Sequence, residues 1–420
     1  MTRTKLAAMA LVVGLAIPFA AAAEDPPPGT FKIPYTDTTA RFYGYVQLDT
    51  MWDVSGRHDP NCDWAGCAAT IPIIGSSAAA RKPQLYWTMH QSRVGFTTST
   101  PTKIPLIGVI GTKVEADFNV GGNFPSPATN SNVFRMRHAY GTLGSWLLVG
   151  QTWGTFTDLG SYPDTVDFNP PANNPLIGQP QVRLTLPAGP GTLMVSVENP
   201  ASSAVGLGGA SAGAFESVPD FVVRYDVTHP YGHVSARVVT LNYKNTAHAN
   251  QGIGGAVSGS FKVLGDSLVA AVQGGHGIGR YTFGALTSGQ DAFSTSSDIL
   301  LWDEIGYHIG YTHVWSPQFR SNLVWSQTFF GGDSAFLSAA GAAGSKAAVL
   351  DSGGDVITPA STVSPGSFTH RIDQGFVNTF WTVTKSFELG LEYTYGRRYT
   401  FDGKAGMENR INASAHFNIF

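Results

Sequence analysis

The stretch F-R-M-R-H-A-Y-G carries the clearest alternation of apolar and polar residues in the chain. Phe134 and Met136 step by two along one predicted face, with His138 expected beside them, while Arg135 and Arg137 occupy the positions between. This alternation predicts a β-strand with one apolar and one charged face. A soluble sheet would bury the apolar face in a core, whereas a transmembrane β-barrel would turn it toward lipid and the charges toward the lumen.

The order of connections along the chain separates these two possibilities. Sixteen strands are expected between residues 41 and 420, and long and short connections alternate between them, with a short turn at Gly265 and long loops near Asn245, over 282–302 and over 331–368. Outer-membrane barrels have an even number of antiparallel strands, short periplasmic turns and long extracellular loops. The predicted fold is therefore all-β, a transmembrane antiparallel β-barrel of 16 strands.

Aromatic residues and the last strand fit the same architecture. The final segment alternates from Ile411 to Ile419 and ends in Phe420, which predicts recognition by the barrel-insertion machinery through the C-terminal strand. Barrels of this kind carry girdles of aromatic residues at both membrane interfaces. Five tryptophans near predicted strand ends are expected there: Trp52, Trp87, Trp302, Trp315 and Trp381.

The N-terminus has the pattern of an export signal. Arg3 and Lys5 precede an apolar run, and a row of alanines ends at Ala23, so residues 1–23 are expected to be a cleaved signal peptide. Residues 24–40 are then a periplasmic leader, and residues 41–420 are the barrel. The predicted location is the outer membrane of a Gram-negative bacterium, with membrane lipid around the barrel.

Composition excludes several classes of protein. Removal of the signal peptide leaves 24 basic and 29 acidic residues, a net charge of −5, so the positive surface of a nucleic-acid-binding protein is not expected. Cys62 and Cys67 are the only cysteines, and in an exported chain we expect them to form a disulfide within one loop. A metal site would need more ligands, and neither a metal nor a cofactor is expected.

Arginines alternate with apolar residues in several predicted strands. An arginine that faces lipid at the bilayer midplane costs about 2–4 kcal/mol, so these side chains are expected to point into the lumen. Guanidinium groups suit bidentate binding of carboxylates, but the same arginines could instead pair with acidic residues of the wall such as Glu115 and Asp117. Six arginines are predicted to line the pore: Arg93, Arg135, Arg137, Arg183, Arg224 and Arg237.

The insert from Thr157 to Gln179 interrupts the predicted strands with a polar, proline-rich segment. Long loops inside compact folds are usually functional. We expect this one to fold into the barrel as a constriction, which would set the carboxylates of Asp158, Asp164 and Asp167 opposite the arginine wall. The transverse field would orient anionic solutes as they pass. The alternative is an extracellular lid.

Several motifs together resemble the DcaP-like family of outer-membrane porins. They are Q-S-R-V-G-F from Gln91, F-R-M-R-H-A-Y-G from Phe134, V-G-Q-T-W-G-T-F-T-D from Val149, P-D-T-V-D-F-N from Pro163, Q-P-Q-V-R from Gln179 and V-E-N-P from Val197. The resemblance implies a homotrimer of sixteen-stranded barrels that takes up small anionic solutes, notably dicarboxylates and aromatic acids. The leader E-D-P-P-P-G has no helical period, so the helical extension that such proteins can carry before the barrel is not expected here.

Two other classes of function compete with a passive porin. An outer-membrane hydrolase would need a nucleophile, and G-A-S-A-G from Gly209 formally matches a nucleophile elbow, although it lies in a predicted loop rich in Gly, Ala and Ser. A structural or adhesin barrel would have a plugged lumen and no measurable conductance. The sequence favours the porin, which is not an enzyme.

Overall fold

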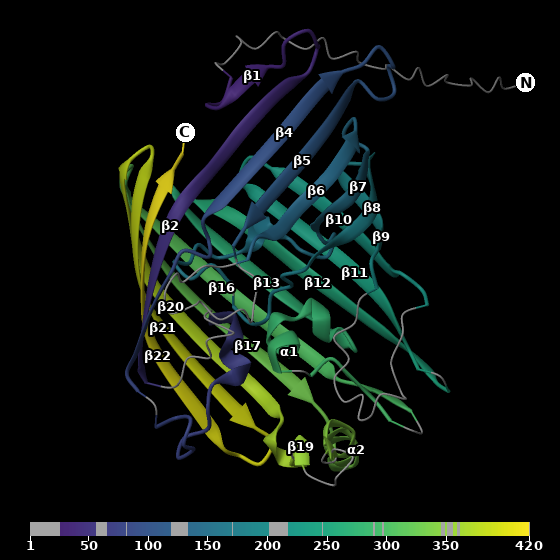
Figure 1. Ribbon diagram of the computed structural model, residues 1–420, viewed down its shortest axis with the longest axis vertical. Coiled ribbons are helices and arrows are strands. Elements are labelled where there is room, and N and C mark those ends of the chain that lie inside the picture. The colour runs from purple at the N-terminus through teal and green to yellow at the C-terminus, as the bar shows by residue number, and fades with distance from the viewer. Residues whose placement is uncertain are drawn as a thin grey trace, which may run out of the picture.

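The computed structural model describes residues 26–55, 65–80, 82–118, 133–169, 171–200, 217–245, 247–288, 290–295, 298–345, 349–350, 356–358 and 362–419. Eighteen of its strands form one antiparallel sheet that closes on itself where the first long strand pairs with the last (Figure 1). Closure leaves no open sheet edge and confirms the predicted barrel of sixteen strands.

The first half of the barrel contains mostly short strands. They are β2 (Thr39–Ser55), β3 (Gln84–Thr88), β4 (Arg93–Pro101), β5 (Val109–Asp117), β6 (Arg135–Leu143), β7 (Leu147–Trp153), β8 (Gly178–Ala188), β9 (Gly191–Glu198) and β10 (Asp220–His229). β3 and β4 pair with successive parts of β2 and together count as one barrel strand. The short β1 (Thr30–Lys32) pairs with the start of β2, so part of the predicted leader is ordered against the barrel.

The second half has longer strands. They are β11 (Gly232–Lys244), β12 (Ala249–Val263), β13 (Asp266–His276), β16 (Asp303–Ser316), β17 (Phe319–Gly331), β20 (Thr369–Thr384), β21 (Phe387–Thr400) and β22 (Ala405–Asn418). The start of β2 and the end of β22 lie at the same end of the barrel as the short turns (Figure 1). The connection near Asn245 is only four residues long, so the predicted long loop there is wrong: β11 and β12 extend as one hairpin instead.

Short elements occupy the long connections. They are η1 (Ala65–Thr70), η2 (Leu159–Ser161), η3 (Gly279–Tyr281), α1 (Phe283–Ser288), β14 (Ala292–Ser294), β15 (Ile299–Leu301), α2 (Ser334–Gly344), β18 (Val349–Leu350), β19 (Val356–Thr358) and η4 (Pro365–Ser367). The connection over 331–368 therefore contains a helix. Asp333 caps its N-terminus by accepting a hydrogen bond from the backbone N–H of Phe336.

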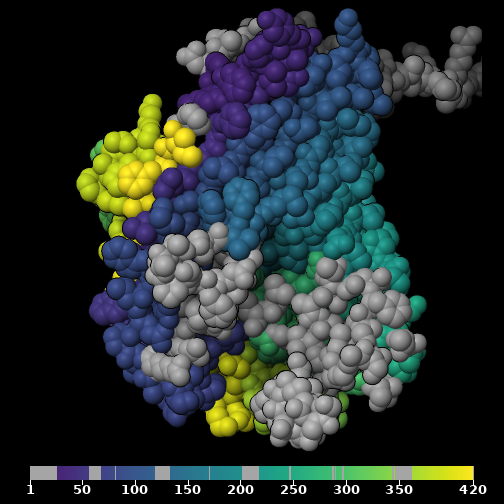
Figure 2. Space-filling model, viewed as in Figure 1, coloured from purple at the N-terminus to yellow at the C-terminus, as the bar shows by residue number. Residues whose placement is uncertain are grey.

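Side chains alternate between the two faces of the barrel wall. In β16, Ile305, Tyr307 and Ile309 are exposed on the outer face, while Glu304 and His308 are buried on the inner face. This is the period of two expected for a strand with one apolar side. Figure 2 shows the outer face of the short strands as a continuous wall of side chains from β4 to β9.

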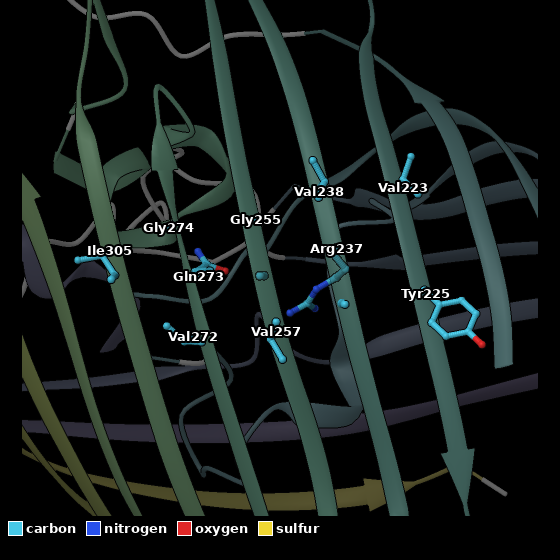
Figure 3. A pocket seen from close by; sticks show the side chains of 12 residues that line it. Val223, Tyr225, Arg237, Val238, Gly255, Val257, Val272, Gln273, Gly274 and Ile305 are labelled. Carbon is cyan, nitrogen blue, oxygen red and sulfur yellow. The ribbon is translucent and has the colours of Figure 1, made fainter. Parts of the chain in front are cut away.

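Glycines make one shallow hollow in the outer wall, where Gly255 of β12 pairs with Gly274 of β13. The valines and isoleucine around it stand on neighbouring strands (Figure 3). Val238, Val257 and Ile305 are exposed there, whereas Arg237 is buried. The wall at this height is therefore apolar outside and charged inside, as the sequence pattern predicts.

An apolar cluster lies at the end of the barrel where the long connections meet. Trp302 is fully buried there, with ring centroids 4.8 to 6.0 Å from those of Phe293, Phe336 and Phe368. The predicted place of Trp302 in an aromatic girdle is wrong, because its segment turns inward and packs against aromatic rings of its own connection and of the connection between β17 and β20. The other four predicted girdle tryptophans are exposed on the outer wall: Trp52, Trp87, Trp315 and Trp381.

Candidate functional site

Two of the six predicted pore arginines, Arg135 and Arg137, belong to a network of ion pairs between β5 and β6. Arg135 donates two hydrogen bonds to Asp117, at 2.8 and 2.7 Å. Arg137 contacts Glu115 Oε1 at 2.9 Å and Asp117 Oδ2 at 3.0 Å. Both carboxylates are buried. For Arg135 and Arg137, the structure therefore favours the alternative of pairing within the wall.

A β-bulge explains why His138 is misplaced by the sequence pattern. The register between β5 and β6 shifts so that Glu115 is opposite His138, while Ala116 is opposite Met136. One residue of β6 is therefore unopposed, and both Arg137 and His138 are buried on the inner side. The ring of His138 is 2.9 Å from the hydroxyl of Thr152, so its predicted outward position is wrong.

Arg93 of β4 sits beside this network. Its Nη1 is 3.4 Å from Glu115 Oε1, which is too long for the bidentate pairing seen at Arg135. Its guanidinium carbon lies 5.1 Å from the ring centroid of Tyr45 and 5.8 Å from that of Phe168. Phe168 belongs to the insert between β7 and β8, so one aromatic contact of Arg93 comes from the wall and the other from the insert.

A second group of arginines lies on β8, β10 and β11. Arg224 contacts Asp226 at 2.7 Å and Asp158 at 3.0 Å. Arg237 is 4.0 Å from Asp158 and stacks over Phe156 at 5.6 Å. These two arginines therefore contact the segment between β7 and β8.

Arg183 differs from the other five predicted arginines. Within the described part of the chain, no carboxylate oxygen lies within 4.0 Å of its guanidinium, and its Nε is buried without a hydrogen-bond acceptor. The carboxylate of Glu198 accepts instead from the Thr155 backbone N–H and the Ser196 hydroxyl, both at 2.7 Å. Glu198 is therefore hydrogen-bonded to neutral donors and makes no direct ion pair with Arg183, although its negative charge still acts on that guanidinium, which is partly exposed on the inner wall.

The insert crosses the inside of the barrel between β7 and β8. Arg320 of β17 contacts Asp164 at 2.6 Å. Asp167 is buried, with Arg410 of β22 at 3.8 Å. Because these partners point inward from strands far from β7, the segment spans the interior. Its carboxylates lie opposite arginines of the wall, as predicted, and those of Asp158 and Asp164 form direct ion pairs with Arg224 and Arg320.

Three further wall residues that hold the insert are absent from the predicted site residues. Glu392 of β21 accepts hydrogen bonds from the backbone N–H groups of Val166 and Asp167, at 2.9 and 3.1 Å. Gln374 accepts one from the Ala172 backbone N–H at 2.8 Å. His308 is 2.9 Å from the Ser161 carbonyl. Their polarity and their inward positions in the alternating pattern identify these residues as part of the lumen wall. Only the fold shows that they bind the insert.

Electrostatics keep Asp158 ionised. Burial alone would raise its pKa, but the hydrogen bond from Ser258, the charge of Arg224 and the contact with His233 outweigh that effect and lower the pKa to about 2. Ser258 donates to Asp158 at 2.6 Å, and His233 Nε2 lies 3.0 Å from it. The carboxylate is therefore a permanent negative charge at neutral pH, and it fixes the start of the insert to β10, β11 and β12.

A second segment also turns inward, which the sequence analysis did not predict. Residues 277–302 connect β13 and β16, and their backbone N–H groups at Phe283 and Gly284 donate to the insert at Asn174 and Ala172, at 3.1 and 2.8 Å. On the opposite side, Gln290 exchanges two hydrogen bonds with the backbone of Thr369. The two inward segments therefore support each other.

Some predicted features lie outside the described residues. These are Cys62, the side chain of Cys67, the G-A-S-A-G segment from Gly209 and the terminal Phe420, so the disulfide stays a prediction. In the part of the chain that the structure describes, no three His, Cys, Asp or Glu side chains group as metal ligands. None of the described helices has the length and apolarity to cross a membrane.

Comparison with solved structures supports the barrel fold. The outer membrane channel DcaP of Acinetobacter baumannii is 24% identical, with a TM-score of 0.74, and the match covers 93% of this chain and 99% of that one. OmpT of Vibrio cholerae, solved in a trimer form, is 11% identical at a TM-score of 0.52, covering 91% and 99%. Salmonella typhi OmpF in complex with daunomycin is 8% identical at 0.53, covering 91% and 98%.

Sequence comparison identifies the family. No curated protein sequence matches the chain significantly. The family described as DcaP outer membrane protein matches residues 30–366, which is most of the chain and includes every predicted pore arginine. This protein therefore belongs to the DcaP outer membrane protein family, whose barrels are channels of the Gram-negative outer membrane.

Proposed function

We propose that the barrel is a passive channel for small anionic solutes, with organic acids and dicarboxylates as the preferred class. The observation that carries this proposal is the unpaired guanidinium of Arg183 on the inner wall. A guanidinium with no direct ion pair attracts anions from solution more strongly than the arginines whose carboxylate partners lie within 4.0 Å. The planar fork of Arg183 also matches the geometry of a carboxylate.

The crossing insert supplies the constriction in this proposal. Asp158 holds it to β10, β11 and β12, and Asp164 and Glu392 hold it to β17 and β21. Their charges are matched by arginines or by backbone N–H groups, so the insert narrows the lumen without repelling anions. Solutes then pass between the insert and the wall of β8 that carries Arg183, where the local field is positive.

A trimer is the proposed assembly, with contacts through the wall of short strands. The outward residues Thr98 and Thr112 are hydrogen-bonded to each other at 2.6 Å, and Gln151 faces outward on β7, two strands from Thr112. Polar side chains are costly against lipid and are better placed in a protein interface. The trimer form of the Vibrio cholerae OmpT structure offers a precedent for the fold. Molar mass by light scattering in detergent tests this assembly.

The direct test of the function is the reversal potential of the purified protein in a planar bilayer under a salt gradient, followed by addition of succinate. Anion preference with blockade that rises with succinate concentration is the expected result. Cation preference without blockade would overturn the proposal. A barrel that carries no current would favour the structural or adhesin alternative.

A further inference from the structure

A separate hollow lies on the inner wall near the periplasmic end of the barrel. Its volume is about 180 Å³, and it is formed by β2, β4, β5 and the end of β22. The side chains that line it are Arg41, Tyr43, Tyr45, Arg93, Glu115 and Asn418. Arg183 is not among them, so the hollow is distinct from the charge that carries the proposed function.

Arg41 brings a free guanidinium to this hollow. Its Nε donates to the backbone carbonyl of Pro28 at 3.3 Å. Over the residues that the structure describes, no carboxylate oxygen lies within 4.0 Å of Arg41. The terminal nitrogens of this guanidinium are therefore available to a bidentate acceptor.

Arg93 adds a second positive charge beside this hollow. Its side chain lines the hollow, and its Nη1 is 3.4 Å from Glu115 Oε1. Its Nε and Nη2 are buried and have no hydrogen-bond acceptor among the described residues, so they contribute charge rather than donors that a solute can reach.

Glu115, the one carboxylate that lines the hollow, is already fully engaged. Its Oε2 accepts from the Tyr43 hydroxyl at 2.8 Å and faces Lys113 Nζ at 3.2 Å. Its Oε1 accepts from Arg137 at 2.9 Å and faces Arg93 at 3.4 Å. Arg137 also pairs with Asp117, whereas Glu115 is the carboxylate within 4.0 Å of both Arg93 and Lys113 in the described residues, so positive charge is in excess beside the hollow.

Two tyrosine rings hold the cations in place. Arg41 and Lys113 lie 5.7 and 5.5 Å from the ring centroid of Tyr43, and Arg93 lies 5.1 Å from that of Tyr45. Tyr43 is itself fixed over Gly95, where a Cβ atom would come within 2.1 Å of its ring, so only glycine leaves room. Cations fixed in this way lose little freedom when a ligand binds.

We infer that this hollow is a carboxylate-binding subsite at the periplasmic exit of the channel, with Arg41 as its hydrogen-bond donor and Arg93 as a second positive charge. It deepens the proposed function, because it would receive an organic acid after the solute has passed the insert. A small carboxylate fits the forked donor of Arg41 while its carbon chain rests against the tyrosine rings.

The test is calorimetric titration of succinate into the purified full-length protein in detergent at low ionic strength. Arg41→Gln should weaken succinate binding about tenfold, the effect expected for loss of a charged hydrogen-bonding partner. Arg41→Lys keeps the charge without the fork and should give an intermediate affinity. Lys103→Gln is the matched control, because Lys103 is exposed in the turn between β4 and β5 and its loss should change affinity less than twofold.

The outcomes separate this inference from the proposed function. Equal affinities of Arg41→Gln and Lys103→Gln would overturn the subsite, even if the channel prefers anions. A tenfold loss in Arg41→Gln would support the subsite, even if the reversal potential of the unmodified protein showed cation preference. Inorganic phosphate that binds as tightly as succinate, with the same dependence on Arg41, would overturn the assignment to carboxylates.

Discussion

Two arginine groups inside this barrel follow the same sequence pattern and have different surroundings. Arg135 and Arg137 on β6 share two buried carboxylates at hydrogen-bonding distance. Arg183 on β8 has no carboxylate partner among the described residues, because the nearby Glu198 accepts from a backbone N–H and a hydroxyl. The phase of an arginine in a strand therefore says which face it is on, but not whether its charge is available to a solute.

The difference assigns different roles to the two groups. Paired arginines stabilise the wall, since removing one partner leaves a buried charge uncompensated. An unpaired arginine contributes little to stability and can be selected for its effect on solutes.

Replacement of Arg137 should have the largest effect on stability. Arg137→Gln leaves Glu115 and Asp117 buried with fewer cations, and we expect the free energy of unfolding to fall by about 3 kcal/mol. Arg183→Gln should change it by less than about 1 kcal/mol. Urea unfolding followed by tryptophan fluorescence measures both, and equal losses would remove the distinction between the two groups.

Acid should weaken the ion pairs of Asp158 with Arg224 and Arg237, which hold the insert to the wall. The pKa of Asp158 is lowered to about 2, below its usual value of 3.8, so its contribution is constant at neutral pH and is lost as pH falls from about 4 to about 2. The expected loss is about 2 kcal/mol of unfolding free energy. Asp158→Asn should lack this component of the acid dependence, and an unchanged profile in that variant would contradict the assignment.

Replacement of Asp164 should have the smallest effect. Asp164 and its partner Arg320 are both partly exposed, and Arg320 also contacts Glu388 at 2.6 Å. Asp164→Asn should therefore lower the free energy of unfolding by no more than about 1 kcal/mol. A loss as large as that of Arg137→Gln would show that partly exposed pairs also support the wall.

The barrel could be predicted from the sequence because its strands follow a regular alternation of apolar and polar residues. Alternation and the rhythm of connections identify strands and turns, and both depend only on neighbouring residues. They failed where the period is broken, as at the bulge that turns His138 inward, and where a segment leaves the wall, as at Trp302.

The partners inside the barrel could not be predicted in the same way. Glu392 meets the backbone of Val166 across 226 positions of sequence, and nothing local encodes that distance. For the same reason, the sequence could not distinguish among the six predicted arginines. In the described residues, Arg183 is the one of these six that has no carboxylate within 4.0 Å and no hydrogen-bond partner. Pairing depends on the closed barrel, which brings remote strands together.

The measurement that tests this account most directly is the reversal potential of Arg183→Gln beside that of Arg135→Gln, in planar bilayers under the same salt gradient. Arg183→Gln should lower the anion-to-cation permeability ratio about fivefold, the effect of roughly 1 kcal/mol from one solvated charge, while Arg135→Gln should retain most of the preference. A preference that survives Arg183→Gln and disappears in Arg135→Gln would contradict the claim that the unpaired arginine selects the solute.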